Sequence, residues 1–328
     1  MTSKRDRLAA TLAGDIADRP PVALWRHFPV DDQDPASLAQ STVAFQQLYD
    51  FDFVKVTPAS SFAVRGWGVE DAWQGSVEGT RVYTRRAVIA PEDWRKLTKL
   101  DPDAGALADC LTCLARVREG LGPDMPILAT IFSPLAQAKN LAGEDVLLEH
   151  LRRMPESLSA GLATLAATTI DFVEAARAVG IDGIFYAIQH ARARTMDLPT
   201  YRRLAEPHDR AILEAAGGLW LNVLHLHGAG VHFELAEEYP VAVVNWHDRE
   251  TSPDLGEGKR RAGKAVCGGI ARVETVVLGN AERIAGEASE AKRQTDGGRG
   301  LVLGTGCVVP ITAPLGNVRA VRAAAEPG

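Results

Sequence analysis

The sequence predicts a single (β/α)8 barrel, a TIM barrel, that spans residues 1–328. Short apolar segments alternate along the chain with helical patterns of ten or more residues, which is typical of βαβ units and a parallel sheet. Eight such apolar segments can be counted, which is the number of strands in a closed barrel. The sequence contains no internal repeat, low-complexity segment or linker that would divide the chain.

The eight predicted strands follow one another in the order of the chain. Several are apolar at consecutive positions, as expected for strands that are buried on both faces. The turn sequence Asp18-Arg19-Pro20-Pro21 precedes the first strand, and Gly180, a typical helix-stop residue, precedes the fourth. The strands are predicted at residues 22–25, 51–56, 126–132, 183–188, 219–226, 241–246, 265–269 and 300–304.

Helices are predicted between the strands, and Pro155 divides the longest of them into two. The segment 64–97 interrupts this rhythm, and its alternating residues 80–84 predict a hairpin excursion between the second and third strands. Because rhythm alone does not require closure, a doubly wound open sheet is the alternative architecture. The helices are predicted at residues 35–48, 104–119, 144–179, 198–216, 233–239, 280–294 and 316–325.

Composition and charge exclude several classes of function. A net charge of −6 and a pI near 5.8 argue against a nucleic-acid partner, and the one dense basic run, Lys259-Arg260-Arg261, is expected to be a solvated loop. We see no secretory signal and no apolar segment near the ~20 residues that a membrane span requires. Four cysteines in 328 residues are not a disulfide framework. We therefore expect a cytoplasmic protein that binds neither nucleic acid nor membrane.

The eight histidines are unevenly placed along the chain. Five of them follow predicted strands, where barrel active sites are built. The other three lie in predicted helices or a loop and are expected at the surface. The first five are His27, His190, His225, His227 and His247, and the other three are His150, His208 and His232.

The segment His225-Leu226-His227 is the most informative local pattern. Residues two apart on a strand point to the same face, so both imidazoles can address one point. Cys307 follows the eighth strand in Gly304-Thr305-Gly306-Cys307, and a thiolate with two imidazoles is a reasonable zinc site. The structural alternative is a polar strand end and a packed cysteine. Amidohydrolase barrels carry an H-x-H pair on the first strand rather than the fifth, so metal-dependent hydrolysis of that type is not expected.

Other polar residues at strand ends are candidates for catalysis and substrate binding. His247 is a candidate acid or base that Asp248 would orient, the alternative being a capped strand end with a salt bridge. Lys55, in the middle of an apolar strand, is costly to bury unless it faces a pocket. The catalytic candidates are His247, Gln189 and His190, and the substrate-binding candidates are Arg26, His27, Lys55, Trp246 and Asp248.

Several segments together resemble the uroporphyrinogen decarboxylase superfamily, over essentially the whole chain. These are Asp18-Arg19-Pro20-Pro21-Val22, Gly180-Ile181-Asp182-Gly183, the segment 198–212, and Gly304-Thr305-Gly306-Cys307-Val308-Val309-Pro310 with the later Pro314. The resemblance implies a TIM barrel. It also makes a homodimer that pairs through the open faces of the barrels an expectation.

One branch of this superfamily transfers methyl groups between corrinoids and thiols, with zinc held by a His-x-Cys pair and a distant Cys. His225 matches the first ligand, Cys307 matches the last, and His227 stands where the family has Cys. The substitution keeps a donor atom but makes the site less rich in thiolate. The resemblance therefore implies a zinc site of His225, His227 and Cys307.

The other branch decarboxylates porphyrinogens, and this sequence departs from it. Arg26 resembles an arginine that pairs with substrate carboxylates. The catalytic aspartate after the second strand has no counterpart, because Lys55 and Thr57 occupy that segment. Neither offers a carboxylate to pyrrole N–H groups. Porphyrinogen decarboxylation is therefore not expected.

Three functions follow, in this order of preference. The first is a zinc-dependent, methyltransferase-like enzyme that transfers a methyl group between a corrinoid, such as methylcobalamin, and a small-molecule thiol. No D-x-H-x-x-G corrinoid-binding motif is present, so the corrinoid would be free or carried by a separate protein. The second is a metal-free decarboxylase or other lyase that acts on a carboxylated substrate. The third is a non-catalytic protein that binds a tetrapyrrole or corrinoid.

Overall fold

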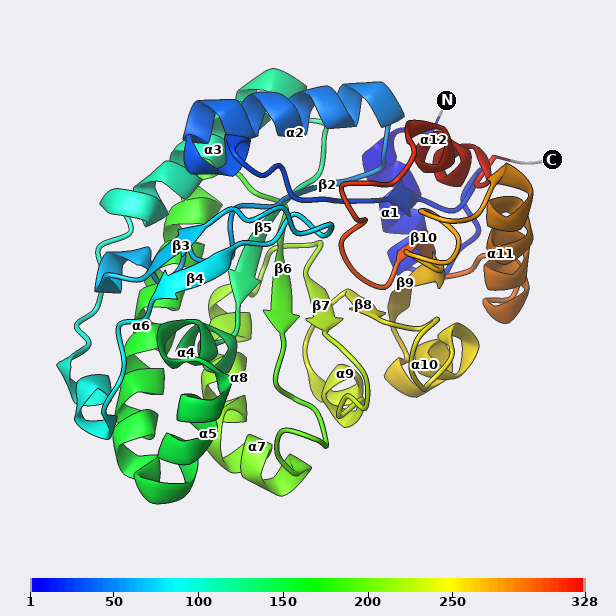
Figure 1. The fold of residues 1–328 in the computed structure, drawn as a ribbon. Coiled ribbons are helices and arrows are strands. Elements are labelled where there is room, and N and C mark those ends of the chain that lie inside the picture. The colour runs from blue at the N-terminus through cyan, green and yellow to red at the C-terminus, as the bar shows by residue number, and fades with distance from the viewer. Residues whose placement is uncertain (1, 327–328) are drawn as a thin grey trace.

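The computed structural model describes residues 2–326 as a barrel of eight parallel strands surrounded by helices (Figure 1). The strands are hydrogen-bonded in the order β1-β10-β9-β8-β7-β6-β5-β2, which confirms the predicted (β/α)8 architecture. Each predicted apolar segment contains one barrel strand, with ends that differ by a few residues. The strands are β1 (Val22–Ala23), β2 (Val54–Val56), β5 (Ile127–Phe132), β6 (Gly183–Ile188), β7 (Val223–Leu226), β8 (Val243–Trp246), β9 (Ala265–Ile270) and β10 (Leu301–Thr305).

The seam between β1 and β2 is closed by one residue, Asp52. Its backbone nitrogen donates to the oxygen of Val22 at 2.8 Å, and its carboxylate accepts from the Val22 nitrogen at 2.7 Å. The same buried carboxylate accepts hydrogen bonds from Arg7 and Arg19 at 2.7 Å each. A paired and fully hydrogen-bonded charge is the form in which a carboxylate is tolerated in a protein interior.

The helices cover the outside of the barrel, and most begin and end close to the predicted positions. The predicted helix 198–216 is instead two helices, because Pro207 lacks the N–H that would continue the first helix and begins a new one. Helices at Lys4–Leu12, Pro134–Ala142 and Leu255–Ala262 were not predicted, although Ser3 caps the first by accepting from the nitrogen of Asp6. The last of them contains Lys259-Arg260-Arg261, which was expected in a loop. The helices are α1 (Lys4–Leu12), α2 (Pro35–Tyr49), α3 (Gly105–Leu121), α4 (Pro134–Ala142), α5 (Glu144–Arg153), α6 (Pro155–Val179), α7 (Leu198–Leu204), α8 (Glu206–Ala215), α9 (Glu234–Glu238), α10 (Leu255–Ala262), α11 (Ala281–Gln294) and α12 (Leu315–Ala323), with single 3-10 turns at Asp31–Gln33, Arg65–Trp67 and Pro91–Lys96.

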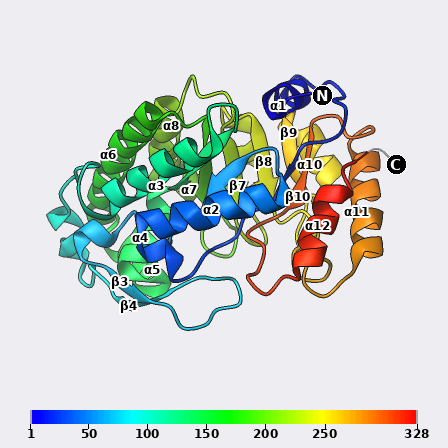
Figure 2. The ribbon, with the colours of Figure 1, turned by 90° about the horizontal axis from the view of Figure 1, so that it is seen from above.

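A separate two-stranded antiparallel sheet lies between β2 and β5 in the chain. It consists of β3 (Glu70–Ala72) and β4 (Val82–Arg85), and its residues are mostly exposed or half-buried. In the view from above, this small sheet lies at the lower left of the molecule and α1 at the upper right (Figure 2). We call residues 73–81, which join β3 to β4, the β3–β4 loop.

Two further expectations are corrected by the structure. Helix α6 is long and apolar enough to cross a membrane, with a mean hydropathy of 1.2, whereas the sequence analysis expected no such segment. Half of that window is buried in the molecule, where α6 packs against α3, α4 and α8. His150 was expected at the surface but is buried, and its Nδ1 accepts a hydrogen bond from the indole nitrogen of Trp94 at 3.0 Å.

Candidate metal centre

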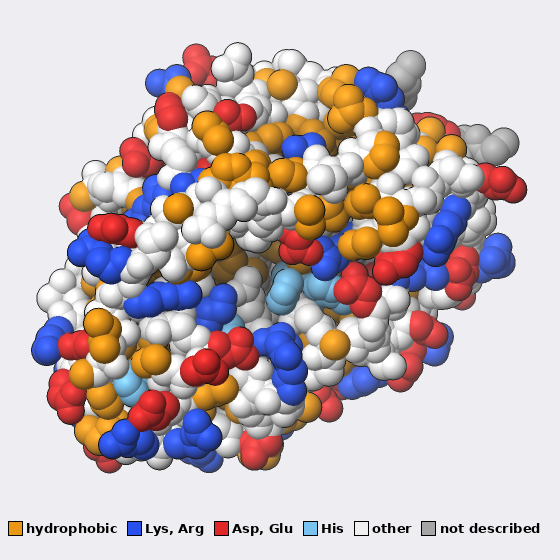
Figure 3. All heavy atoms as spheres, in the orientation of Figure 1, with side chains coloured by type: hydrophobic (Ala, Val, Ile, Leu, Met, Phe, Trp, Pro, Cys, Tyr) orange, Lys and Arg blue, Asp and Glu red, His pale blue; other side chains and the backbone are white. Residues whose placement is uncertain are grey.

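A cavity of about 420 Å³ opens at the carboxyl ends of the barrel strands. The space-filling view shows histidine side chains at the bottom of a hollow on this face, with charged side chains around its mouth (Figure 3). The wall combines aromatic residues such as Trp25 and Phe185 with polar residues from the ends of β2, β6, β7 and β10. The β3–β4 loop contributes Glu78, Thr80 and Arg81.

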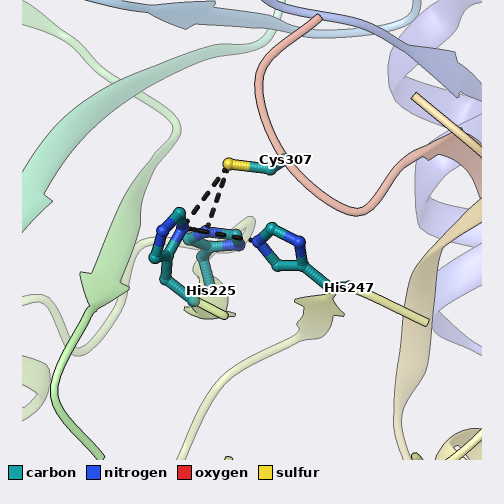
Figure 4. A group of neighbouring side chains, drawn as sticks. His225, His247 and Cys307 are labelled. Carbon is teal, nitrogen blue, oxygen red and sulfur yellow. Dashed lines mark hydrogen bonds between the residues drawn. The ribbon is translucent and has the colours of Figure 1, made fainter. Parts of the chain in front are cut away.

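Four side chains that can bind a metal converge beside this cavity: His225, His227, His247 and Cys307. One ligand atom from each lies within 4.8 Å of all the others. Nδ1 of His227 is 3.4 Å from Nε2 of His225, 3.4 Å from Nε2 of His247 and 3.6 Å from Sγ of Cys307. The distance from Sγ of Cys307 to Nε2 of His225 is 3.8 Å. Figure 4 shows the side chains of His225 on β7, His247 just after β8 and Cys307 after β10 pointing toward one another.

The barrel itself brings the four residues together. His225 and His227 lie on the same face at the end of β7, and the parallel register pairs His225 with Asn245 of β8. His247, two residues beyond Asn245, therefore lies beside His227, and the two ring centroids are 4.9 Å apart. Cys307 approaches from the segment after β10, where a side chain on Gly306 would lie 2.7 Å from Cα of His247. Only glycine allows this close approach.

Hydrogen bonds around the cluster fix which ring nitrogen of each histidine faces the cluster. The Asn245 side-chain nitrogen donates to the carbonyl oxygens of Cys267 and Thr305, so its oxygen must face Nδ1 of His225, at 2.6 Å. His225 therefore carries its proton on Nδ1 and presents the lone pair of Nε2 to the cluster. In the same way, Nδ1 of His247 donates to Glu250 at 3.0 Å, which leaves Nε2 of His247 free.

The donor set fits zinc. Zinc is bound tetrahedrally by imidazole nitrogen at about 2.0–2.1 Å and by thiolate sulfur at about 2.3 Å. These bond lengths imply donor–donor distances of about 3.4 Å between nitrogens and about 3.6 Å between nitrogen and sulfur. The four shortest contacts among the donors, 3.4, 3.4, 3.6 and 3.8 Å, are close to these values, and all the donors lie within 4.8 Å of one another. Three imidazoles and one thiol are also the ligand types that zinc takes in proteins.

Burial sets the protonation of these groups. It lowers the pKa of His227 to about 3, helped by the nearby His247, and lowers the pKa of His225 well below its ordinary value. It raises the pKa of the Cys307 thiol to about 11. The imidazoles of His225 and His227 thus keep their lone pairs at neutral pH, while Cys307 would lose a proton on binding a metal.

Lys55 and His27 lie in the cavity wall, in agreement with the sequence analysis. The Lys55 ammonium is buried, donates to the hydroxyl of Thr57 at 3.2 Å and lies 4.8 Å from the ring centroid of Phe185. Burial lowers the pKa of Lys55 to about 7. Phe185 in turn stacks on His225, so this lysine lies close to the candidate metal centre.

Gln189 and His190 also line the cavity. Both ring nitrogens of His190 are buried without a hydrogen-bond partner, and so is Nε of Arg192. Lys139 lines the same wall and donates only to the side chain of Asn140, at 3.3 Å. Arg192 has one acidic neighbour, Glu144, at 3.8 Å. This wall therefore carries more positive than negative charge, and it offers hydrogen-bond donors that have no partner among the described residues.

Three predicted substrate-binding residues lie away from the cavity. Trp246 faces outward because neighbours on a strand point to opposite faces, and its indole nitrogen donates to the oxygen of Pro253 at 2.9 Å. Asp248 is buried behind the strand ends and accepts from the nitrogen of Gly269 at 3.0 Å. Arg26 also faces outward, with its guanidinium 5.5 Å from the ring centroid of Phe28. Asp248 does not orient His247, since Glu250 occupies that position.

Some residues of the site were not predicted from the sequence. His247 was predicted as an acid or base rather than a metal ligand, and Glu250, Lys139 and Arg192 were not singled out. His247 could have been found from its place at the end of the strand that follows the His225-Leu226-His227 pair, because consecutive parallel strands are neighbours in a barrel. No signal in the sequence marks Lys139, which lies on α4.

A known protein family matches almost the whole chain. The sequence profile described as "Uroporphyrinogen decarboxylase (URO-D)" matches residues 3–327. The chain belongs to the uroporphyrinogen decarboxylase family. Its relatives within and around this family include methyltransferases. The methylcobamide:CoM methyltransferases MtaA of Methanosarcina barkeri and of its strain Fusaro are 25% and 27% identical over 218 residues, 66% of this chain and 62% of theirs. The match thus spans less than two thirds of those relatives.

Solved structures support the same fold for this member of the family. A methyltransferase from Methanosarcina mazei superposes with a TM-score of 0.85 and 21% identity over 99% of both chains. A B12-independent methionine synthase from Shewanella sp. W3-18-1 gives a TM-score of 0.61 and 16% identity, over 89% of this chain and 86% of its own. At these identities, the two structures establish the barrel fold alone.

Proposed function

We propose that this protein is a zinc-dependent methyltransferase that moves a methyl group between a corrinoid and a small-molecule thiol. The observation that carries the proposal is the convergence of His225, His227, His247 and Cys307 beside a cavity, with one donor atom of each within 4.8 Å of the others. The methyltransferase relatives support the reaction class. The zinc, the corrinoid and the thiol acceptor are our assignments.

The residues present define what the site would do. Zinc bound there would lower the pKa of a substrate thiol and so provide a thiolate at neutral pH. That thiolate would attack the methyl group of the donor, and a corrinoid donor would keep the electron pair of the cobalt–methyl bond. Asn245 and Glu250 orient two of the imidazoles, while Trp25 and Phe185 exclude water from one wall of the cavity.

Four protein donors would fill a tetrahedral shell, whereas catalytic zinc keeps a position for substrate. A substrate thiol would therefore have to take the place of one donor. His247 is the donor that we assign to this role. Its hydrogen-bond partner Glu250 is 38% exposed, whereas Asn245, which holds His225, is fully buried. Displacing His247 from the metal should therefore cost less free energy than displacing His225.

The charge of the cavity wall indicates which class of substrate the site would accept. Lys55, Lys139 and Arg192 have few acidic partners, so we propose that the thiol or the methyl donor carries an anionic group such as a carboxylate or phosphate. The His190 ring, without a partner among the described residues, would donate to the same group. Acidic thiols such as 3-mercaptopropionate should then be methylated faster than 2-mercaptoethanol, and equal rates would contradict this part of the proposal.

The decisive experiment measures metal in the purified protein by mass spectrometry, beside His227→Ala and the control His208→Ala, a histidine on α8 far from the cluster. We expect about one zinc per chain in the wild type and in the control, and loss of most of it in His227→Ala. Consumption of methylcobalamin with each thiol, followed by absorbance, then tests turnover before and after chelation.

Each outcome selects among the three functions. Metal lost with His227, together with turnover that chelation abolishes, supports the methyltransferase. A protein without metal would contradict it. Turnover of a carboxylated substrate after exhaustive chelation would favour the lyase, which already lacks Arg26 in its cavity. A bound visible chromophore without turnover would favour a tetrapyrrole- or corrinoid-binding protein.

The partners and location follow as proposals. We propose that the methylated corrinoid arrives free or on a separate protein, that the enzyme acts in the cytoplasm, and that it pairs as a homodimer. Size-exclusion chromatography with light scattering measures the last of these directly, and a monomer at micromolar concentration would contradict it.

A further inference from the structure

A chain of charged contacts joins the β3–β4 loop to the candidate metal ligand His247. Arg272, in the segment after β9, donates through Nε to Oε1 of Glu250 at 3.1 Å and through Nη1 to the carboxylate of Glu78 in the loop. The other oxygen of Glu250, Oε2, accepts from Nδ1 of His247 at 3.0 Å. The order is thus Glu78, Arg272, Glu250, His247, with alternating charge along the three side chains that lead to the imidazole.

Other contacts also seat the β3–β4 loop, among them the ion pair of its Arg81 with the buried Asp32 at 3.4 Å. The nitrogen of Ile311, four residues beyond Cys307, donates to the oxygen of Val77 at 2.8 Å. The backbone of Gly79 lies so close to His27 that a Cβ there would be 2.5 Å from that of His27. Glu78 and Thr80 line the cavity. The loop therefore covers one side of the cavity and contacts the segments after β1, β9 and β10.

Arg272 links this cover to the metal centre. Its side chain is 13% exposed and lies between two carboxylates that are 34% and 38% exposed. A guanidinium is planar and can hold two carboxylates in fixed directions at once. If the loop lifts, Arg272 loses one of its two partners, and the direction of Glu250, and with it that of the His247 ring, becomes less constrained. Partners of this kind orient metal ligands and raise metal affinity.

We propose that Glu78 and Arg272 are positioning residues that couple the seating of the β3–β4 loop to the orientation of His247 toward the other three donors. This inference rests on the proposed metal centre. It implies that a substrate that enters beneath the loop and displaces Glu78 also frees His247 to leave the metal. The β3–β4 loop would then lift at the same time as His247 leaves the metal.

The test is a double-mutant cycle on zinc affinity, measured by chelator competition with the full-length chain. Arg272→Met should weaken zinc binding about ten-fold, at the low end of the effects of outer ligand partners, and Glu78→Gln, one contact further from the metal, roughly five-fold. In a His247→Ala background neither substitution should weaken it further. The three remaining donors keep binding measurable in that background. The control is Glu70→Gln, which removes an exposed ion pair with Arg85 on the same small sheet.

Coupling between zinc binding and loop seating acts in both directions, so hydrogen exchange of the loop provides a second measurement. If loop seating raises zinc affinity, zinc must favour the seated loop by the same factor. Hydrogen exchange in residues 73–81 should therefore slow when zinc is added to the wild type, and should not change in His247→Ala.

Three outcomes overturn the inference. These are equal losses in both backgrounds, no loss in either, and zinc-independent exchange of the loop in the wild type. If the wild type binds no zinc at all, the proposed function fails first, which is a different result. Melting of the metal-free variants identifies any substitution that acts by unfolding the chain.

Discussion

At the scale of single residues, Asn245 determines the geometry of the candidate metal centre. Its amide is held by two backbone carbonyls from β9 and β10, and its oxygen fixes the tautomer of His225 on β7. One side chain thus connects four consecutive strands at the level of the site. An oxygen acceptor that is fixed in this way costs no further ordering when a metal binds.

Asn245→Leu should lower zinc affinity about 10- to 100-fold, because His225 loses the acceptor that keeps Nε2 free for the metal. The measurement is chelator competition. Asn222→Leu is the matched control, since Asn222 is a buried asparagine that accepts from the nitrogen of Ile184 and donates to the oxygen of Ala216. It should cost stability without changing zinc affinity. Equal affinity in wild type and Asn245→Leu would remove Asn245 from the site.

The buried histidines make stability depend on pH. Burial lowers the pKa of His27 and of His190 to about 3, while an unfolded histidine titrates near pH 6.5. Between these values the unfolded chain binds protons that the folded chain does not. Stability is therefore complete above about pH 6.5 and is lost as the pH falls toward 3, by up to about 1.4 kcal/mol per pH unit for each group.

Urea unfolding of the metal-free protein at several values between pH 7 and 5 measures this slope. His190→Gln should reduce the slope, because glutamine does not titrate. A slope that stays the same in His190→Gln would show that this ring is protonated in the folded state as well.

At the scale of elements, the packing of α10 on β8 explains why Trp246 is unavailable to substrate. Its ring lies against Phe233, with ring centroids 5.0 Å apart, and beneath Gly258 of α10. A Cβ at Gly258 would lie 2.3 Å from the indole ring, so the helix can approach the strand only because residue 258 is glycine. Trp246 thus anchors a helix, while its neighbours Asn245 and His247 face the site.

Gly258→Ala should lower the free energy of unfolding by roughly 1–3 kcal/mol through overpacking, with zinc content unchanged per folded molecule. Gly286→Ala on α11 is the matched control. No atom lies within 4 Å of a Cβ placed there, and alanine in an exposed helix should stabilise by about 0.5–1 kcal/mol. Urea unfolding separates the two, and a neutral Gly258→Ala would mean that α10 shifts without cost.

At the scale of the whole molecule, the barrel depends on Asp52 for its last seam. The other seven neighbouring strand pairs share ladder hydrogen bonds, whereas β1 and β2 are joined through the backbone and carboxylate of this residue. Arg7 of α1 and Arg19 bind the same carboxylate and so tie the N-terminal segment to the closure.

Asp52→Asn should cost about 3–5 kcal/mol, because Arg7 and Arg19 lose the buried counter-charge that they share and keep only the more exposed Asp18 and Glu326. Asp50→Asn is the control two residues away, where an exposed carboxylate pairs with Lys4 and Arg322 and should contribute about 1 kcal/mol or less. Denaturant midpoints compare the two, and similar losses would mean that the seam does not depend on Asp52.

Local patterns predicted the barrel and part of the site. The eight apolar segments identify the strands because burial on both faces requires continuous apolar residues. The same-face spacing of His225 and His227 predicted that they would act together. Register between strands is set by tertiary packing, so the pairing of His225 with Asn245, which brings His247 into the cluster, could not be predicted from either strand alone.

Trp246, Asp248 and Arg26 were predicted to bind substrate but lie outside the cavity, each for a different physical reason. The period of two that grouped His225 with His227 also separates Trp246 from His247, and applying it would have placed Trp246 outside the cavity. Asp248 and Glu250 are both acidic and close to His247 in sequence, and only the turn after β8 decides which of them reaches the imidazole. Arg26 was assigned by resemblance, and the two-residue β1 ends before it.

The four candidate ligands are close in space but distant in the chain. His225 and Cys307 are 82 residues apart, and β8, β9 and β10 lie between them in the chain. An ion held by all four would be a cross-link across the last third of the barrel, absent from the unfolded chain. Its stabilisation of the fold would grow with the logarithm of the zinc concentration divided by Kd. Scarcity of zinc in a cell would then shorten the lifetime of the protein against proteolysis, as well as removing its activity.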